Sequence, residues 1–314
     1  MTEHRFFSQV KASTKFSSSG LKSGLVGAIA TLMCTIMYTT PGLAGDPFRT
    51  KDPRPIGDKT EAAFKSIFLK GNYQAADNLL KQALDSEKNE PLAYAMRASL
   101  AYTSKDFAGL ESYSKKTREI GEKLISQDPL RGNLYTAVGH FLEGAISLQR
   151  QGTVSGAPAA LGKLRQVYQY LDKAEAISAN DPELNLVKGF MDLMIAVNLP
   201  FANPEQAIER LNSNAAPRYL AQRGIAIGYR DLKQYNQALD YVNKALQETA
   251  ENPEIYYLKA QILRAMALKE KNPQKMQEAV TNFDKALSQK SQLPQSTVKQ
   301  IERERRNAVS EIKK

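Results

Sequence analysis

The sequence predicts an all-α protein, a solenoid of about six helical hairpins that ends in a C-terminal capping helix. Three observations predict this class. From Lys59 onward, apolar residues recur at helical spacing, and the alternating Val, Ile and Thr runs typical of strands are not found. Similar stretches of sequence recur along the chain, which indicates a repeat. Prolines that follow an aspartate or asparagine mark repeated helix starts.

Residues 1–44 are predicted to be a signal peptide. A basic region precedes 14 uncharged residues from Leu25 to Tyr38, fewer than the roughly 20 that span a bilayer. Small residues at Gly42 and Ala44 predict cleavage after Ala44 and an extracytoplasmic location, such as the periplasm or an equivalent lumen. Retention as an uncleaved anchor is the alternative. Cys34, the only cysteine, would be lost with the signal, which leaves no disulfide.

Residues 45–58 are predicted to form an extended linker. They contain three prolines and two glycines and little apolar content, so they do not favour a helix or a strand. The domain that follows is predicted to occupy residues 59–290.

The repeat is visible when the stretches that begin at Lys70 and Leu232 are compared. Both carry a tyrosine and two alanines at the same three- and seven-residue intervals, and a proline follows the second alanine after eight residues. The proline interval recurs in two further copies, ending at Pro182 and Pro294. In the two aligned stretches the matching residues are Tyr73, Ala76 and Ala83, and Tyr235, Ala238 and Ala245.

This pattern resembles the tetratricopeptide repeat, a helical hairpin of 34 residues, and in particular the secreted proteins of bacteria and cyanobacteria that carry it. The copy at Tyr219–Asn252 fits best, whereas the tryptophan of the family's first helix is missing throughout. The resemblance implies a right-handed solenoid with six hairpins between Gly57 and Lys290. The third hairpin carries an insertion at 151–162, predicted to be a mobile loop that either contacts a partner or is inert.

Residues 295–314 are predicted to form the capping helix. Val298, Ile301, Ala308 and Ile312 recur at helical spacing opposite a charged face. A terminal helix of this kind covers the exposed end of a stack of repeats.

Residue types needed for common catalysis are scarce. Beyond the signal, His140 is the only histidine, and its pairing with Glu143 three residues later indicates a hydrogen bond before it indicates a metal site. Ser155 lacks the glycine spacing of a nucleophile elbow. We therefore expect no enzymatic activity, no cofactor, no metal and no small-molecule substrate.

The formal net charge of +10 is spread along the chain, with acids and bases interleaved. Because no basic stripe carries interleaved aromatic residues, we expect no nucleic-acid binding. Oligomeric state is left open.

The first helices of stacked hairpins line a concave face, so residues at fixed positions in each repeat share one stripe. In the fourth repeat this stripe is apolar, which indicates either core packing or a groove for an extended peptide. In the fifth and sixth repeats a cationic and aromatic patch is predicted to contact an acidic partner segment, with a solvated groove rim as the alternative. The first stripe is Leu186, Phe190, Leu193 and Val197, and the patch is Arg223, Arg230, Tyr257, Gln261 and Arg264.

The leading functional hypothesis is a scaffold or adaptor outside the cytoplasm that holds a protein or peptide in its concave groove, in the assembly of an envelope or membrane complex. The alternative is a structural protein that associates with a membrane surface or a cell-wall polymer through its basic C-terminal helix. Arg303, Arg305 and Arg306 support that alternative, although Glu302 and Glu304 interrupt the run.

Overall fold

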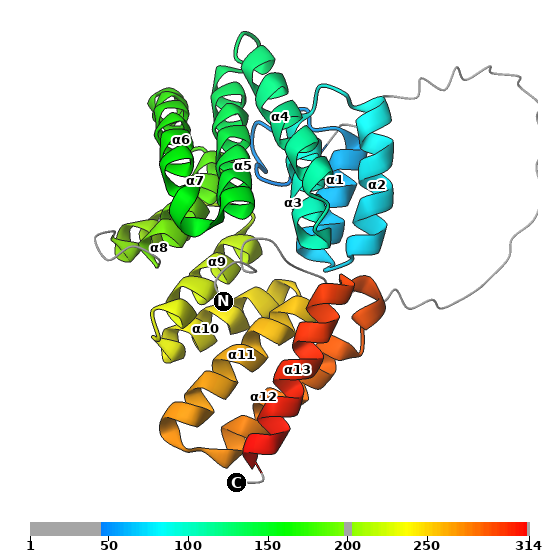
Figure 1. Ribbon diagram of the computed structural model, residues 1–314, viewed down its shortest axis with the longest axis vertical. Coiled ribbons are helices and arrows are strands. Elements are labelled where there is room, and N and C mark those ends of the chain that lie inside the picture. The colour runs from blue at the N-terminus through cyan, green and yellow to red at the C-terminus, as the bar shows by residue number, and fades with distance from the viewer. Residues whose placement is uncertain (1–44, 198–202, 313–314) are drawn as a thin grey trace, which may run out of the picture.

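The computed structural model describes residues 45–197 and 203–312, and the predicted signal peptide lies outside them. Within the described residues the chain is helical and has no strand, and successive helices pack in antiparallel pairs (Figure 1). The pairs are α1 (Asp58–Phe64) with α2 (Tyr73–Ser86), α3 (Pro91–Ser104) with α4 (Phe107–Leu124), α5 (Pro129–Ser155) with α6 (Ala157–Ile177), α7 (Pro182–Ala196) with α8 (Pro204–Ser213), α9 (Arg218–Asp231) with α10 (Tyr235–Glu248), and α11 (Pro253–Glu270) with α12 (Pro273–Leu287).

Six hairpins therefore make up the described chain, and α13 (Gln295–Ile312) packs on α12 as the terminal helix. The predicted all-α solenoid of hairpins is confirmed. A π-helical turn, η1 (Lys65–Leu69), prolongs α1, and a 3-10 turn, η2 (Lys290–Gln292), precedes α13. Among the described helices, none is both long enough and apolar enough to cross a membrane.

Helix starts follow the predicted chemistry. The side chain of Asp181 accepts a hydrogen bond from the amide of Leu184 at 3.0 Å, and Asn252 accepts one from Glu254 at 2.8 Å. In both helices proline occupies the first turn, where its missing amide proton costs no hydrogen bond. These caps set where each hairpin begins.

The alanines that recur in the second helices lie in the hydrophobic core. Ala76, Ala83, Ala238 and Ala245 are fully buried. A methyl side chain lets two helices approach closely, which is the physical reason for a small residue at these places in the repeat. The repeat signature is therefore a packing signature.

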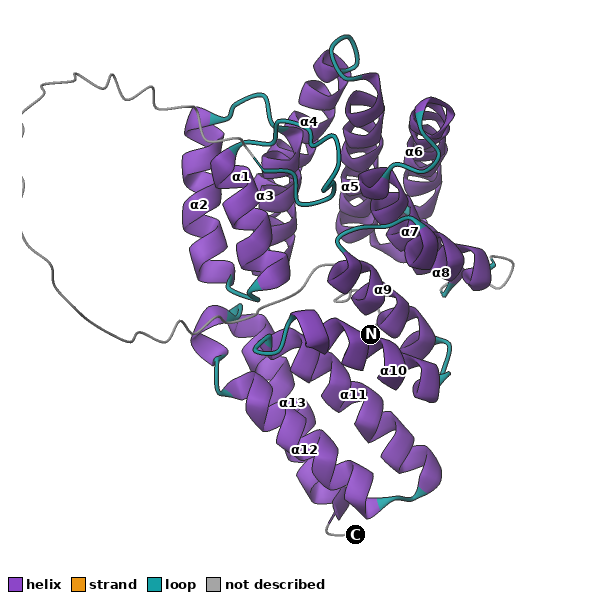
Figure 2. Cartoon of the chain, turned by 180° about the vertical axis from the view of Figure 1, so that it is seen from behind, coloured by secondary structure: helices purple, strands orange, loops and turns teal. Residues whose placement is uncertain are grey.

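The stack turns far enough for its first and last hairpins to meet, a contact that the repeat pattern did not predict. The hydroxyl of Tyr73 in α2 donates to Glu254 in α11 at 3.0 Å, across 181 residues of sequence. Gly71 lies against the start of α11, where an added Cβ would stand 3.0 Å from Asn252 Oδ1, and its φ of +51° favours glycine. Figure 2 shows the base of the first hairpin beside the start of α13.

The expected mobile loop at 151–162 is wrong. Helix α5 continues to Ser155 and α6 begins at Ala157, so the insertion lengthens both helices. The break is confined to Gly152, where φ is +77°, and to Gly156. The physical reason is that the two helices pack on one another up to this end, where Gly144 lies against Ala160, and the alanines after Gly156 favour a helix.

The terminal helix α13 buries the face that its spacing predicts. Val298, Ile301 and Ala308 are buried against the preceding hairpin. Its charged face contacts α11 and α12 through ion pairs described below. Both faces of α13 thus engage the sixth hairpin.

Candidate binding site on the concave face

A cavity of about 120 Å³ lies on the concave side of the stack. Its wall is mostly apolar and comes from the first helices of five hairpins, α1, α3, α5, α7 and α9. The segment before α1, η1 and Tyr73 of α2 also contribute. The repeat geometry explains this origin, because first helices line the inner side of a solenoid. Lining side chains include Phe64, Ile67, Met96, Val138, Leu186 and Phe190.

One part of the cavity wall is partly exposed. Ile67 and Met96 are buried, whereas Phe141, Val187 and Phe190 are only half-buried. Ala95 and Leu100 of α3 also line the cavity and are half-buried, so the partly exposed wall comes from α3, α5 and α7. The apolar stripe predicted for the fourth repeat serves both the core and this wall: Leu186 and Leu193 are buried, and Leu186 and Phe190 line the cavity.

Arg223, one of the predicted partner-binding residues, lies in the cavity wall and not on an exposed rim. Its side chain is 5% exposed. Burial lowers the pKa of Arg223 to about 10, and the nearby carboxylate of Glu254 opposes that effect. Tyr73, which donates to Glu254, is also close. Arg223 therefore stands where the first and sixth hairpins meet.

The other predicted residues form a continuous polar cluster along α9 and α11. Arg230 donates to the side-chain oxygen of Gln261 at 2.7 Å and pairs with Asp231 at 2.9 Å. Gln261 in turn donates to Glu304 at 3.0 Å. The spacing argument that placed these residues on one face is thus consistent with their contacts.

Acidic residues of α13 cover this cluster. Tyr257 donates to Glu304 at 2.8 Å, and Arg264 donates to Glu311 at 2.9 Å. Burial, and then the charge of Glu304, raise the pKa of Tyr257 well above its usual value. Within the described chain, the acidic segment that these side chains contact is α13 itself. An acidic partner would have to displace it.

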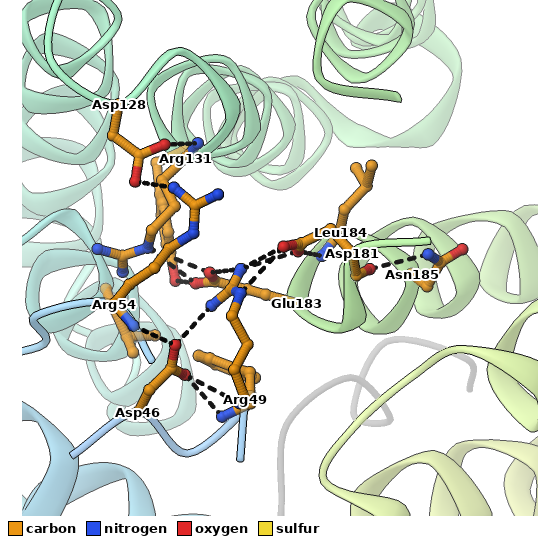
Figure 3. A network of polar contacts seen from close by, with 12 residues as sticks. Asp46, Arg49, Arg54, Asp128, Arg131, Asp181, Glu183, Leu184 and Asn185 are labelled. Carbon is orange, nitrogen blue, oxygen red and sulfur yellow. Dashed lines mark hydrogen bonds and ion pairs between the residues drawn. The ribbon is translucent and has the colours of Figure 1, made fainter. Parts of the chain in front are cut away.

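The structure contains a second polar cluster that the sequence analysis did not predict. It is centred on Glu183, at the start of α7, whose side chain is fully buried (Figure 3). Arg49 donates to Glu183 at 2.9 Å and to Asp181 at 2.7 Å, and Arg131 donates to Glu183 at 3.1 Å. Arg131 also bonds to Glu90 at 2.8 Å. Buried charges of this kind are stable only when they are paired and hydrogen-bonded.

Arg49 belongs to the segment 45–58 that was expected to be an extended linker, of which residues 45–57 precede α1. Residues 45–57 have no helix or strand, but they are folded around one carboxylate: Asp46 accepts from the amides of Phe48 and Arg54 at 2.8 and 2.9 Å. Arg54 pairs with Asp128 at the start of α5. The segment is therefore docked on the concave face.

Phe48 docks the same segment through apolar contact. Its ring lies edge-on against Phe64, with 5.0 Å between ring centroids, and it forms part of the cavity wall. Asp181 was interpreted only as a helix cap. The signal that sequence reasoning could have used is the pair Phe48-Arg49, an aromatic and a cation within a segment otherwise typical of a linker.

His140 and Glu143, the one pair weighed as metal ligands, belong to an ion-pair cluster. His140 Nδ1 lies 3.4 Å from Glu143 Oε2, and Glu143 also contacts Arg118 and Lys163. Burial opposes ionisation, but the nearby His140 and the hydrogen bonds from Lys163 and Arg118 lower the pKa of Glu143 to about 2. Among the described residues, no group of three or more potential ligands is placed to hold a metal ion.

Comparison with protein-family models gives no match, and comparison with curated proteins gives none either. The tetratricopeptide resemblance therefore stays a prediction.

Proposed function

We propose that this chain is a binding protein that accepts an apolar anchor residue of a protein or peptide partner in its concave cavity. The observation that supports the proposal is the cavity itself: apolar walls from five hairpins, bordered by half-buried Phe141, Val187 and Phe190. Binding sites of this kind are concave and mostly apolar, with a few polar groups at fixed places.

The volume indicates the size of the anchor. A cavity of about 120 Å³ is close to the engineered cavities of about 150 Å³ that admit benzene. It therefore suits one aromatic or branched aliphatic side chain. Single buried anchors of this kind often dominate the free energy of protein association.

The contact between the first and sixth hairpins fixes the helices that form the cavity. The Tyr73 to Glu254 contact joins the first and sixth hairpins, so the walls of the cavity are held on both sides. A preformed site loses less conformational entropy on binding. The cavity supports a scaffold or adaptor role. The predicted signal peptide adds the expectation that the chain acts outside the cytoplasm, where we propose a role in assembly of an envelope or membrane complex.

The alternative, attachment to a membrane or polymer through α13, is supported by two exposed side chains, Arg303 and Arg306. Arg305, the third arginine of the predicted basic run, pairs with Asp284 of α12. The apolar face of α13 is buried on the sixth hairpin, so only electrostatic attachment remains for this helix.

Site-specific crosslinking in the native compartment tests the proposal. A photoreactive residue replaces Phe190 in the cavity wall, and a matched control replaces exposed Leu161 on α6. We expect discrete protein adducts from position 190 that are missing from position 161. Identical adducts at both positions, or cofractionation with polymer without adducts, would contradict a cavity-bound partner.

A further inference from the structure

Phe48 and Arg49 place an aromatic ring and a guanidinium side by side on the concave face. The ring enters the cavity wall beside Phe64, and the guanidinium contacts Asp181 and Glu183. We propose that residues 45–57 occupy in cis the site of a partner segment in which an aromatic residue is followed directly by arginine, and that such a partner displaces them. The aromatic half of this inference rests on the proposed function.

The charges around the site select a cationic occupant. Without residues 45–57, the guanidinium of Arg131 would still pair with Glu90 and Glu183. Asp128 and Asp181 would lose Arg54 and Arg49 and would keep the backbone amides of Arg131 and Leu184 as partners. Asp181 is buried in the folded chain, so removing Arg49, which pairs with it, is unfavourable. An occupant must therefore supply at least one positive charge.

The geometry favours arginine over lysine. Arg49 uses Nε and Nη2 together on Asp181, at 3.0 and 2.7 Å, and Nη2 also reaches Glu183. A planar guanidinium makes such a forked contact, whereas an ammonium acts as a point charge. The aromatic neighbour is selected by the apolar cavity wall beside it.

Residues 45–57 are held by contacts of a few residues, which favours their release. It has no backbone ladder with the helices, and residues 50–53 are exposed between the anchors at Arg49 and Arg54. Ile56 is fully buried next to α1 and would keep the released segment attached.

Residues 45–57 are covalently attached to the site, so they compete with any free peptide that binds there. A short flexible tether gives a local concentration of the order of millimolar, so a free peptide binds the wild-type chain weakly. Weakening the cis anchors should increase the affinity for the same peptide. Substitutions in residues 45–57 can therefore free the site in the full-length chain without changing the site itself.

The test is titration of a fluorescent peptide with the sequence of residues 45–57 into the full-length chain. We expect the Phe48→Ala/Arg49→Ala variant to bind at least about tenfold more tightly than wild type. The matched variant Thr50→Ala/Lys51→Ala alters exposed neighbours and should behave as wild type. A glycine and serine peptide that carries only Phe-Arg should also bind the first variant, and one with Phe-Glu should not.

Thermal unfolding of each variant is measured first. If the double alanine variant does not fold, Arg49→Lys replaces it, because that change keeps the charge and removes the forked contact. Equal peptide affinity for wild type and the weakened variant, or none for the weakened variant, overturns the inference. Benzene titrated into wild type, followed by methyl NMR of Met96 and Met191, tests the cavity separately. Loss of peptide binding with benzene uptake intact refutes the cis occupant alone, and failure of both refutes the proposed function as well.

Discussion

Arg49 and Glu183, which are 134 positions apart in the sequence, form an ion pair at 2.9 Å inside the concave face. Glu183 also accepts from Arg131 at 3.1 Å and from the hydroxyl of Tyr135 at 2.6 Å. One fully buried carboxylate therefore joins the N-terminal segment, the third hairpin and the fourth hairpin.

Glu183→Ala should destabilise the chain strongly. It leaves Arg49 and Arg131 buried near the site without their shared partner, and breaking a buried pair costs about 3 to 5 kcal/mol. The matched change is Glu111→Ala, which removes a half-exposed pair with Arg150 and should cost less than about 1 kcal/mol. Denaturant midpoints compare the two variants. Equal losses of stability would show that the buried Glu183 pairs contribute no more than the surface pair of Glu111.

Tyr73→Phe should loosen the contact between the first and sixth hairpins. It removes the hydrogen bond to Glu254, and a bond to a charged group contributes about 1.5 to 3 kcal/mol. We expect faster amide hydrogen exchange in both α2 and α11. Tyr256→Phe, which removes a surface bond to the carbonyl of Ala250, is the control. Faster exchange confined to α2 would indicate that this hydrogen bond does not hold the first and sixth hairpins together.

Two glycines of the third hairpin should respond oppositely to alanine. Gly152 has a φ of +77° and a ψ of 169°, a region that is essentially restricted to glycine, so Gly152→Ala should cost about 1 to 3 kcal/mol. Gly162 lies inside α6 with nothing within 4 Å of an added Cβ, so Gly162→Ala should stabilise by about 0.5 to 1 kcal/mol. Urea unfolding measures both. No effect at either position is the result expected of a loop.

Stability should depend on pH through Glu143. Its pKa is lowered to about 2 in the folded chain by His140, Lys163 and Arg118, against burial. Because the unfolded group binds protons more readily, its contribution is present above about pH 4.5 and disappears as the pH falls toward 2. The full effect is at most about 3 kcal/mol.

The variant Glu143→Gln should flatten that part of the stability profile. Glu122→Gln alters a more exposed partner of the same Arg118 and should leave the slope nearly unchanged. Unfolding midpoints measured from pH 2 to pH 6 decide this. A wild-type slope retained by Glu143→Gln would assign the pH dependence to other groups.

Local pattern was enough to predict the hairpins. Apolar spacing, the buried alanines such as Ala76 and Ala238, and caps such as Asp181 each act within one or two helices, so the sequence displays them directly. The helical insertion was missed because glycine-rich composition indicates a loop, while tertiary packing of α5 on α6 decides the conformation.

The candidate site depends on contacts that spacing does not encode. Spacing placed Arg230, Gln261 and Arg264 on one face, but it did not show that Glu304 and Glu311 of α13 contact the same residues. The docked segment was missed for the same reason. Nothing local to Phe48 and Arg49 indicates the cavity and the carboxylates that receive them.

We propose that the concave cavity receives an apolar anchor of a partner, and a side chain that fills the cavity leaves no room for that anchor. Ala95→Trp places an indole in the cavity wall, and Ala159→Trp places one on the exposed surface of α6. After both variants are shown to melt as wild type, the partners crosslinked through position 190 are quantified in each. We expect the adducts to persist in Ala159→Trp and to be lost in Ala95→Trp. Undiminished adducts in Ala95→Trp would contradict the claim.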